Sequence, residues 1–347
     1  MTDPDILIER RGAAGLVTLN RPRALNAVTL GMVRALRDAL DRWRDDPAVT
    51  RVVIAGAGGR AFSAGGDLRQ MYDLCRAGRH AEALVYWREE YALNRIIKYY
   101  PKPYVALIDG ITMGGGAGLS VHGSHRVAGD RLQFAMPEVA IGFFPDVGAT
   151  FFLPRLPGEL GAWCAVTGER LGPDDALAAG IATHRVASGR FADLLDGFAD
   201  GAPVDAVLAA VGQPAGEGPL APHRAAIDRL FAGDAAGAIL DALDRDGSAF
   251  AATAAKTMRS RSPTSVALAL AQVRRGGGLS FDDCLRLEFR IVSRLVHGHD
   301  FYEGVRAVLI DKDNAPRWRP ATLAGVADAE IERHFAPLPE AEEWRPT

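Results

Sequence analysis

The 347-residue sequence has few cysteines, no excess of basic charge and no long apolar run, and each absence excludes a class of protein. Its three cysteines, Cys75, Cys164 and Cys284, lie far apart, so they provide neither a disulfide framework nor a paired metal site. No apolar stretch reaches the roughly 18 residues of a membrane span. The 40 Lys and Arg residues against 43 Asp and Glu leave a net charge of −3, which argues against a nucleic-acid partner.

The first twelve residues, MTDPDILIERRG, are acidic with one short apolar run. They resemble neither a secretory signal nor an Arg- and Ser-rich transit peptide. Sparse cysteine is typical of a reducing compartment. We therefore expect a cytoplasmic protein with no membrane partner.

The apolar periodicity predicts an α/β fold. Strand-like runs at 15–19, 51–55 and 104–108 alternate with helical spacing over 29–45 and 84–99. A strand, a helix and a further strand in this order indicate a parallel βαβ unit. The length fits two domains or one large α/β domain.

Three segments are rich in glycine. Residues 56–61 formally fit the dinucleotide fingerprint G-x-G-x-x-A, but they follow the second strand, so we interpret them as a loop. In 62–68, two glycines precede Asp67, which can cap the next helix. In 109–120, a strand enters a helix through three glycines, which leaves backbone N–H donors bare. Such donors can form an oxyanion hole, or the glycines can serve close helix–strand packing.

Two carboxylates interrupt the apolar segment FAMPEVAIGFFPDVG at 134–148. Burial among Met, Val, Ile and Phe side chains raises the pKa of an acid such as Glu138. Asp146 precedes an apparent helix at 147–153, whose dipole favours the ionised form. Two acids in unlike settings can divide acid and base roles, or they can be a helix cap and a salt bridge.

A serine hydrolase built on Ser120 with His122 or His125 is a weaker hypothesis. The segment GLSVHG misses the G-x-S-x-G pattern by one position, and Ser120 is predicted inside a helix rather than on a strained elbow. The two histidines have i, i+3 spacing, but a metal site lacks a third ligand.

Five segments together resemble the crotonase, or enoyl-CoA hydratase/isomerase, superfamily. They begin with NRPRALNAV and AFSAGGDL and occupy residues 20–28, 61–68, 102–123, 134–158 and 167–186. The resemblance implies a ββα spiral core over residues 1–200 that carries an acyl-CoA site. Residues 201–347 are then a helical C-terminal region, in which 201–262 show no obvious chemistry.

Within this superfamily the chain is most similar to the 3-hydroxyisobutyryl-CoA hydrolase family of valine catabolism. The discriminating segments are WREEY at 87–91, AMPE followed by PDVG, and the C-terminal SPTS and DFYEGVRAVLIDKD. The last two lie outside the common crotonase core. The resemblance implies a thioesterase of the 3.1.2.4 class with no cofactor beyond the CoA of its substrate and no metal.

The resemblance also assigns roles residue by residue. The two oxyanion-hole N–H groups fall on Gly66 and Gly115. Of the two hydratase glutamates, the second matches Glu138 and the first falls on Gly118, which puts water addition to a double bond in doubt. Asp146 matches the hydrolase aspartate and Glu90 a ligand for a substrate hydroxyl. CoA would be bound by Arg23, Ala24, Leu25, Ala64, Gly66, Asp67 and Leu68.

Three questions stay open on sequence alone. Glu138 could attack the thioester and form an anhydride, or it could act as general base for water. An enoyl-CoA hydratase or isomerase on the same fold, and a non-catalytic acyl-CoA binder, are the rival functions. Related crotonases form trimers or hexamers, so the resemblance implies a homo-oligomer unless the C-terminal region covers that surface.

Overall fold

The computed structural model describes residues 4–346. The chain forms two compact units that interleave along the sequence, whereas two consecutive regions were expected. Unit 1 comprises Met1–Gly66, Ala92–Ala135 and Arg170–Ala221, and unit 2 comprises Asp67–Tyr91, Met136–Glu169 and Pro222–Thr347. Over the described range, every helix is too short or too polar to cross a membrane.

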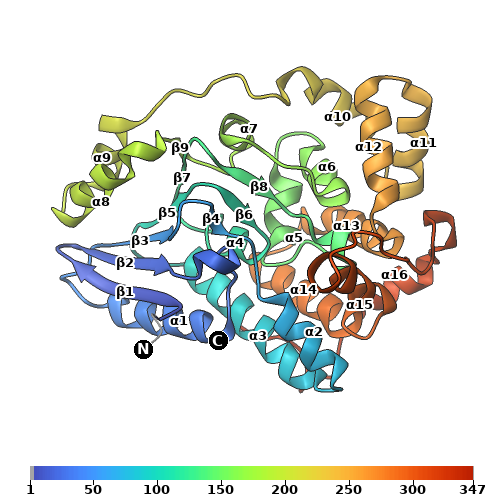
Figure 1. Ribbon diagram of the computed structural model, residues 1–347, viewed down its shortest axis with the longest axis horizontal. Helices are drawn as coiled ribbons and strands as arrows, with labels where there is room; N and C mark the ends of the chain where they lie inside the picture. The colour runs from blue at the N-terminus through green and yellow to red at the C-terminus, as the bar shows by residue number, and fades with distance from the viewer. Residues whose placement is uncertain (1–3, 347) are drawn as a thin grey trace. The chain divides into compact units, whose positions relative to one another are not determined.

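Unit 1 contains two sheets (Figure 1). The six-stranded sheet has the order β1 (Ile6–Arg11), β2 (Ala14–Leu19), β3 (Arg51–Gly56), β5 (Tyr104–Ile108), β7 (His125–Ala128) and β9 (His184–Arg185). The three-stranded sheet has the order β4 (Ala61–Ser63), β6 (Ile111–Met113) and β8 (Gln133–Ala135). All neighbouring strands are parallel except β1 and β2.

Strands alternate between the two sheets along the chain. In the pairs β3–β4, β5–β6 and β7–β8, the first strand joins the larger sheet and the second joins the smaller one. This repeated step is the spiral that the crotonase resemblance implied. It brings the chain segment after β4 and the segment after β6 to neighbouring positions, because β4 and β6 pair directly.

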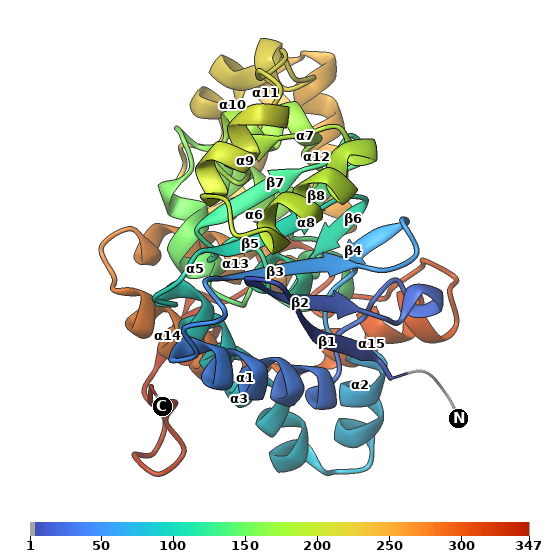
Figure 2. The same ribbon diagram turned by 90° about the vertical axis from the view of Figure 1, so that its left-hand side faces the viewer.

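The helices of unit 1 pack on its two sheets, one of them against β4 and β6 of the smaller sheet. They are α1 (Leu30–Arg44), α4 (Gly115–Gly118), α7 (Pro173–Ala178), α8 (Phe191–Ala199), α9 (Val204–Val211) and the C-terminal part of α3 (His80–Lys98). Phe198 and Leu208 pack with Val53 and Leu107 in one buried cluster. Helix α1 runs along β1 and β2 (Figure 2). A Cβ on Gly15 would lie 2.6 Å from the Trp43 ring, so glycine permits this close approach.

Unit 2 is helical. Its α-helices are α2 (Leu68–Arg76), most of α3, α5 (Ala149–Phe152), α6 (Leu160–Thr167), α10 (Arg224–Leu230), α11 (Ala236–Asp246), α12 (Ala249–Ser260), α13 (Pro263–Gly276), α14 (Phe281–Leu295), α15 (His299–Val305) and α16 (Asp328–Phe335). Helices α11 and α12 pack as a pair (Figure 1). Helix α13 is central, since it contacts α5, α6, α11 and α16.

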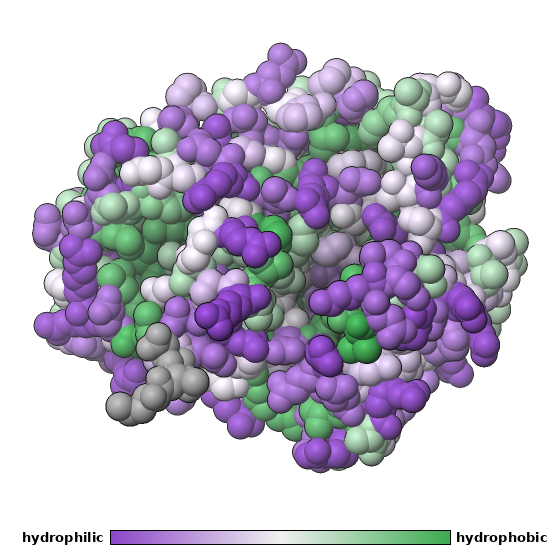
Figure 3. Space-filling view, in the orientation of Figure 1, coloured by the Kyte–Doolittle hydropathy of each residue, from purple (hydrophilic) through white to green (hydrophobic). Residues whose placement is uncertain are grey.

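Short helical turns complete the two units. They are η1 (Pro22–Ala24), η2 (Glu138–Ile141), η3 (Leu153–Arg155), η4 (Ser188–Arg190), η5 (Ala221–His223), the π-helical turn η6 (Arg306–Ile310) and η7 (Leu323–Gly325). Hydrophilic residues cover most of the face drawn in Figure 3. Among the described residues, Leu7, Val85 and Tyr99 are the exposed large hydrophobic ones.

Two local predictions are confirmed. Asp67 caps α2 as predicted, by accepting a hydrogen bond from the Gln70 N–H. The glycines at 56–59 form the end of β3 and a loop. The position of Ser120 was predicted wrongly, because α4 ends at Gly118 and Ser120 lies in the turn that follows.

Candidate active site

Two glycine turns of unit 1 lie against each other. A Cβ built on Gly65, which has φ +110°, would lie 3.3 Å from the Met113 carbonyl oxygen and 3.5 Å from the Gly115 nitrogen. A Cβ on Gly116 would lie only 2.5 Å from the Ser63 carbonyl oxygen. Close packing therefore requires these glycines, as one of the sequence interpretations proposed. The same contacts bring Gly65, the neighbour of Gly66, beside Gly115.

The backbone N–H groups of Gly66 and Gly115 remain available. Gly115 is the first residue of α4, and an N–H at that position has no partner within its helix. Within residues 4–346, neither N–H donates a hydrogen bond to another group of the protein. The turns can thus present two donors toward a ligand oxygen.

The segments predicted to hold CoA in unit 1 are bonded to each other. The Ala64 N–H donates to the Leu25 carbonyl oxygen at 2.9 Å, and the Val28 N–H donates to the Gly65 oxygen at 2.8 Å. The Asn26 side chain, fully buried, donates to the Ala61 oxygen at 2.9 Å. Arg23 and Ala24 are exposed on η1 beside this junction. Asp67 and Leu68 follow in the chain at the start of α2.

Among the described residues, unit 2 contains five buried carboxylates, which are Asp300 and a group of four. Glu138 lies at the start of η2, Asp146 on the loop between η2 and α5, Glu90 on α3 and Glu288 on α14. Each is at most 5% exposed. None of the four forms an ion pair with any residue that the structure describes. A buried cluster of acids without a cation is costly for structure alone, and such clusters mark functional sites.

Each carboxylate has its own hydrogen-bonding pattern. Asp146 Oδ2 accepts from the Tyr91 hydroxyl at 2.9 Å, and Glu90 Oε1 accepts from the Tyr86 hydroxyl at 3.0 Å. Glu138 Oε2 is buried with no hydrogen-bond partner among the described residues. An unpartnered buried oxygen is a candidate for contact with a reacting molecule.

Burial raises the pKa of all four acids. It raises the pKa of Asp146 to about 7, against the lowering effect of the Tyr91 hydrogen bond. Burial, reinforced by repulsion from Asp146, raises the pKa of Glu90 and Glu138 well above the usual range and that of Glu288 to about 8. The cluster therefore keeps protons near neutral pH and titrates as coupled groups. The raised pKa predicted for Glu138 is confirmed.

We expect the protein to lose stability as pH rises from about 4 to about 8. The folded state holds protons on Asp146 and Glu288 that the unfolded chain releases, so the stabilisation is complete below pH 4 and lost through the folded-state pKa values. Each pKa unit corresponds to about 1.4 kcal/mol. Urea unfolding at stepped pH checks this. Asp146→Asn should flatten the dependence, and Glu217→Gln, at an exposed site, should not.

The prediction that a helix dipole favours the ionised form of Asp146 is wrong. Helix α5 begins only at Ala149 and has four residues, so its dipole is small and burial prevails. The loop itself is strained: Val147 has φ +54°, which is unusual for a β-branched residue and costs roughly 1–3 kcal/mol. Such strain persists only where surrounding contacts hold the loop.

Sequence reasoning missed Glu288. It lies on the buried side of α14 among Cys284, Leu285 and Val292, where helical spacing predicts apolar side chains. A charged residue in the apolar stripe of an amphipathic helix was the available signal.

The serine-hydrolase hypothesis receives no support from the geometry. The Ser120 hydroxyl is buried and donates to the Gly116 carbonyl oxygen at 2.8 Å. His125 contacts Ser124 and Asp205 instead. We expect Ser120→Ala to change acyl-CoA turnover less than about twofold, which a steady-state assay checks. A loss of 10²-fold or more would restore the hypothesis.

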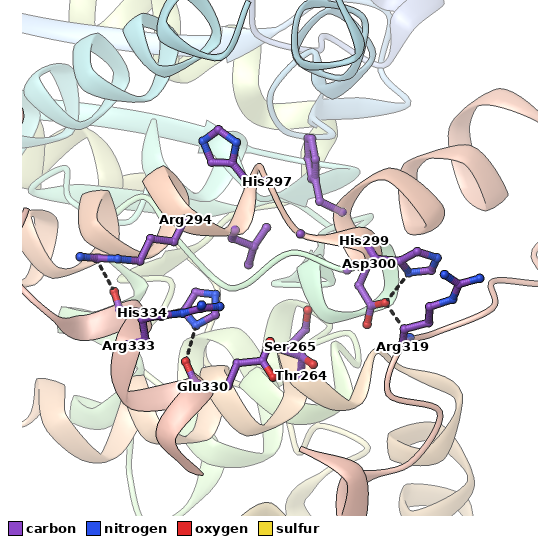
Figure 4. A pocket seen from close by; sticks show the side chains of 14 residues that line it. Thr264, Ser265, Arg294, His297, His299, Asp300, Arg319, Glu330, Arg333 and His334 are labelled. Atoms are coloured by element: carbon purple, nitrogen blue, oxygen red, sulfur yellow. Dashed lines mark hydrogen bonds and ion pairs between the residues drawn. The ribbon is translucent and has the colours of Figure 1, made fainter. Parts of the chain in front are cut away.

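A polar cavity of about 150 Å³ in unit 2 is separate from the predicted residues (Figure 4). His299 and Arg319 surround Asp300, whose carboxylate accepts from the Ser262 hydroxyl and the Arg319 N–H. These contacts join the start of α13 to α15. None of the four carboxylates lines the cavity. Within the described part of the chain, no cluster of His, Cys, Asp or Glu could hold a metal ion.

Comparisons with known proteins place this chain in one family. The family model described as enoyl-CoA hydratase/isomerase matches residues 14–335. A curated relative from Danio rerio, the mitochondrial 3-hydroxyisobutyryl-CoA hydrolase, is 46% identical over 97% of this chain and 90% of its own length. The match thus includes the C-terminal region.

Two solved structures are also similar over nearly the whole chain. A carnitinyl-CoA dehydratase from Mycobacterium thermoresistibile has a TM-score of 0.94 at 42% identity, covering 97% of this chain and 98% of its own. An enoyl-CoA hydratase from Rhodobacter sphaeroides 2.4.1 has a TM-score of 0.93 at 41% identity, covering 99% and 100%. The names of these two structures describe a dehydratase and a hydratase, whereas the curated relative is a hydrolase. The reaction of this chain must therefore be inferred from the residues of its site.

The predicted cytoplasmic localisation is wrong by this comparison, because the hydrolase relative is described as mitochondrial. The cysteine content indicates only the redox state of a compartment and could not distinguish one reducing compartment from another.

Proposed function

The chain belongs to the enoyl-CoA hydratase/isomerase family, and from that premise we propose that it hydrolyses 3-hydroxyisobutyryl-CoA to 3-hydroxyisobutyrate and CoA. The observation that carries this proposal is the set of carboxylates. Glu138 and Asp146 are present and buried, whereas the family resemblance places the first hydratase glutamate at Gly118, which has no side chain.

We assign the polarisation of the thioester carbonyl to the N–H groups of Gly66 and Gly115. As the carbonyl carbon becomes tetrahedral, its oxygen gains negative charge, and preorganised donors stabilise that charge by roughly 3 kcal/mol each. The two turns support this role because they adjoin each other and their N–H groups are available.

Glu138 then acts in its ionised form. Either it attacks the carbonyl carbon and water hydrolyses the resulting anhydride, or it takes a proton from the attacking water. In both cases the C–S bond breaks, the CoA sulfur leaves as a thiolate and takes up a proton, and the acyl carbon gains a hydroxyl. Burial supports this role, since a raised pKa makes Glu138 a stronger base than a solvated glutamate.

We propose that Asp146 and Glu90 bind and orient the substrate hydroxyl and water. Their ordered contacts with Tyr91 and Tyr86 support orientation rather than attack. The CoA moiety is assigned to Arg23, Ala24, Leu25, Ala64, Gly66, Asp67 and Leu68. We further propose a place in valine degradation, no cofactor beyond the CoA of the substrate, and assembly as a homo-oligomer.

The experiment follows free thiol and enoyl absorbance in the same samples. With 3-hydroxyisobutyryl-CoA, we expect one thiol per substrate consumed. With an unsaturated acyl-CoA of the same carbon skeleton, we expect the double-bond absorbance to stay constant unless thiol is released. Absorbance change without thiol would establish the hydratase or isomerase instead, and CoA affinity without any turnover would indicate a binding protein.

A further inference from the structure

We propose that Glu288, on helix α14 of the C-terminal region, is a positioning residue of the hydrolysis that holds the strained loop of Asp146. This inference rests on the proposed function, because it assigns a part in the same reaction. It concerns only residues of unit 2.

Glu288 binds the loop through both of its oxygens. Oε2 accepts from the Gly148 N–H at 2.8 Å and Oε1 accepts from the Thr150 N–H at 2.9 Å. Glu288 is completely buried. These N–H groups belong to the residues that open α5, which lie two and four positions after Asp146. Because one side chain accepts both hydrogen bonds, it fixes the direction in which the chain leaves Asp146.

A second helix holds the other side of the loop. The Gln272 amide on α13 donates to the Pro145 carbonyl oxygen, one residue before Asp146. The residue between the two anchors, Val147, is the one with φ +54°. Contacts on both sides therefore maintain a conformation that the loop alone would not favour.

The same helices also reach the turn that carries Glu138. The Ser262 N–H, at the start of α13, donates to the Val139 oxygen at 3.1 Å. A Cβ on Gly304 of α15 would lie 2.2 Å from the carbonyl carbon of Ile141, so α15 packs directly on η2. The segments SPTS and DFYEGVRAVLIDKD, outside the common crotonase core, thus include residues that support the carboxylate-bearing turns.

The test is a double-mutant cycle with wild type, Glu288→Gln, Asp146→Asn and the double variant. Glutamine preserves the volume but turns an N–H donor toward one of the two N–H groups. We expect Glu288→Gln to lower kcat about 10- to 100-fold with KM within about threefold. In the Asp146→Asn background the same change should lower kcat less than about twofold, since Glu288 acts through Asp146.

A matched control is Asp283→Asn, which removes a half-buried carboxylate paired with Arg286 from the first turn of the same helix and should leave kcat unchanged. If Glu288→Gln does not fold, Glu288→Asp replaces it in the cycle. The shorter side chain cannot reach both N–H groups, and kcat should fall about tenfold. A wild-type kcat in the folded variant, or a loss that persists in the Asp146→Asn background, would overturn the proposal.

Urea unfolding of the same four proteins separates this inference from the proposed function. We expect the effects of the two substitutions on the unfolding equilibrium constant to be non-additive by a factor of about five or more. Additive effects would overturn the role of Glu288 even if thiol is released. Absence of thiol release from wild type, with the coupling present, would instead overturn the proposed function alone.

Discussion

Glu138→Gln and Asp146→Asn should each lower thiol release from 3-hydroxyisobutyryl-CoA by about 10²-fold or more, the scale of a lost acid–base group. Glutamine at position 138 keeps the volume of the side chain but can neither attack the thioester nor take a proton from water. Asparagine at 146 can still accept from Tyr91 but cannot ionise. Steady-state kinetics with a thiol reagent measure both variants.

The matched control for these substitutions is Glu217→Gln, a carboxylate-to-amide change at an exposed site. It should leave turnover unchanged. Near-normal turnover in Glu138→Gln or Asp146→Asn would remove the role given to that residue. Because the substituted sites are buried, circular dichroism melts must show that each variant is folded.

Gly115→Pro should lower kcat by about 10²- to 10³-fold, the loss expected when one oxyanion donor is removed. Proline has no N–H, and the first position of a helix tolerates it, because the N–H there bonds to nothing within the helix. The substitution therefore deletes the donor in question while preserving α4. Steady-state kinetics on the folded variant provide the measurement.

Ala249→Pro is the control for the proline itself. Ala249 is the first residue of α12 and is exposed, so the same substitution there should not alter kcat. If Gly115→Pro folds and keeps wild-type kcat, the N–H of Gly115 does not stabilise the transition state, and the oxyanion hole must be assigned elsewhere.

The sequence predicted correctly those features that depend only on neighbouring residues. The strand at 104–108 has the predicted bounds, and Asp67 caps α2 as predicted. The crotonase resemblance implied the spiral, and the apolar segment at 134–148 singled out the carboxylates Glu138 and Asp146. These features depend on periodicity, caps and motifs, which neighbouring residues determine.

Contacts between distant segments could not be predicted in this way. Glu288 lies 140 residues from Gly148, and no local pattern links the two. The dipole argument for Asp146 failed for the same reason: burial depends on the packing of distant segments, and its effect on the pKa outweighs that of a helix of four residues. The interleaving of unit 2 along the chain likewise depends on long-range packing rather than composition.

The most direct test of the central claim compares thiol release from 3-hydroxyisobutyryl-CoA and isobutyryl-CoA, which differ by one hydroxyl. The account predicts hydrolysis of the hydroxylated thioester with a kcat/KM at least about tenfold higher, since a site built to bind a hydroxyl discriminates against its absence. Equal rates would contradict the assignment of the hydroxyl to polar groups of the site. Absence of thiol release from both substrates would contradict the hydrolase function itself.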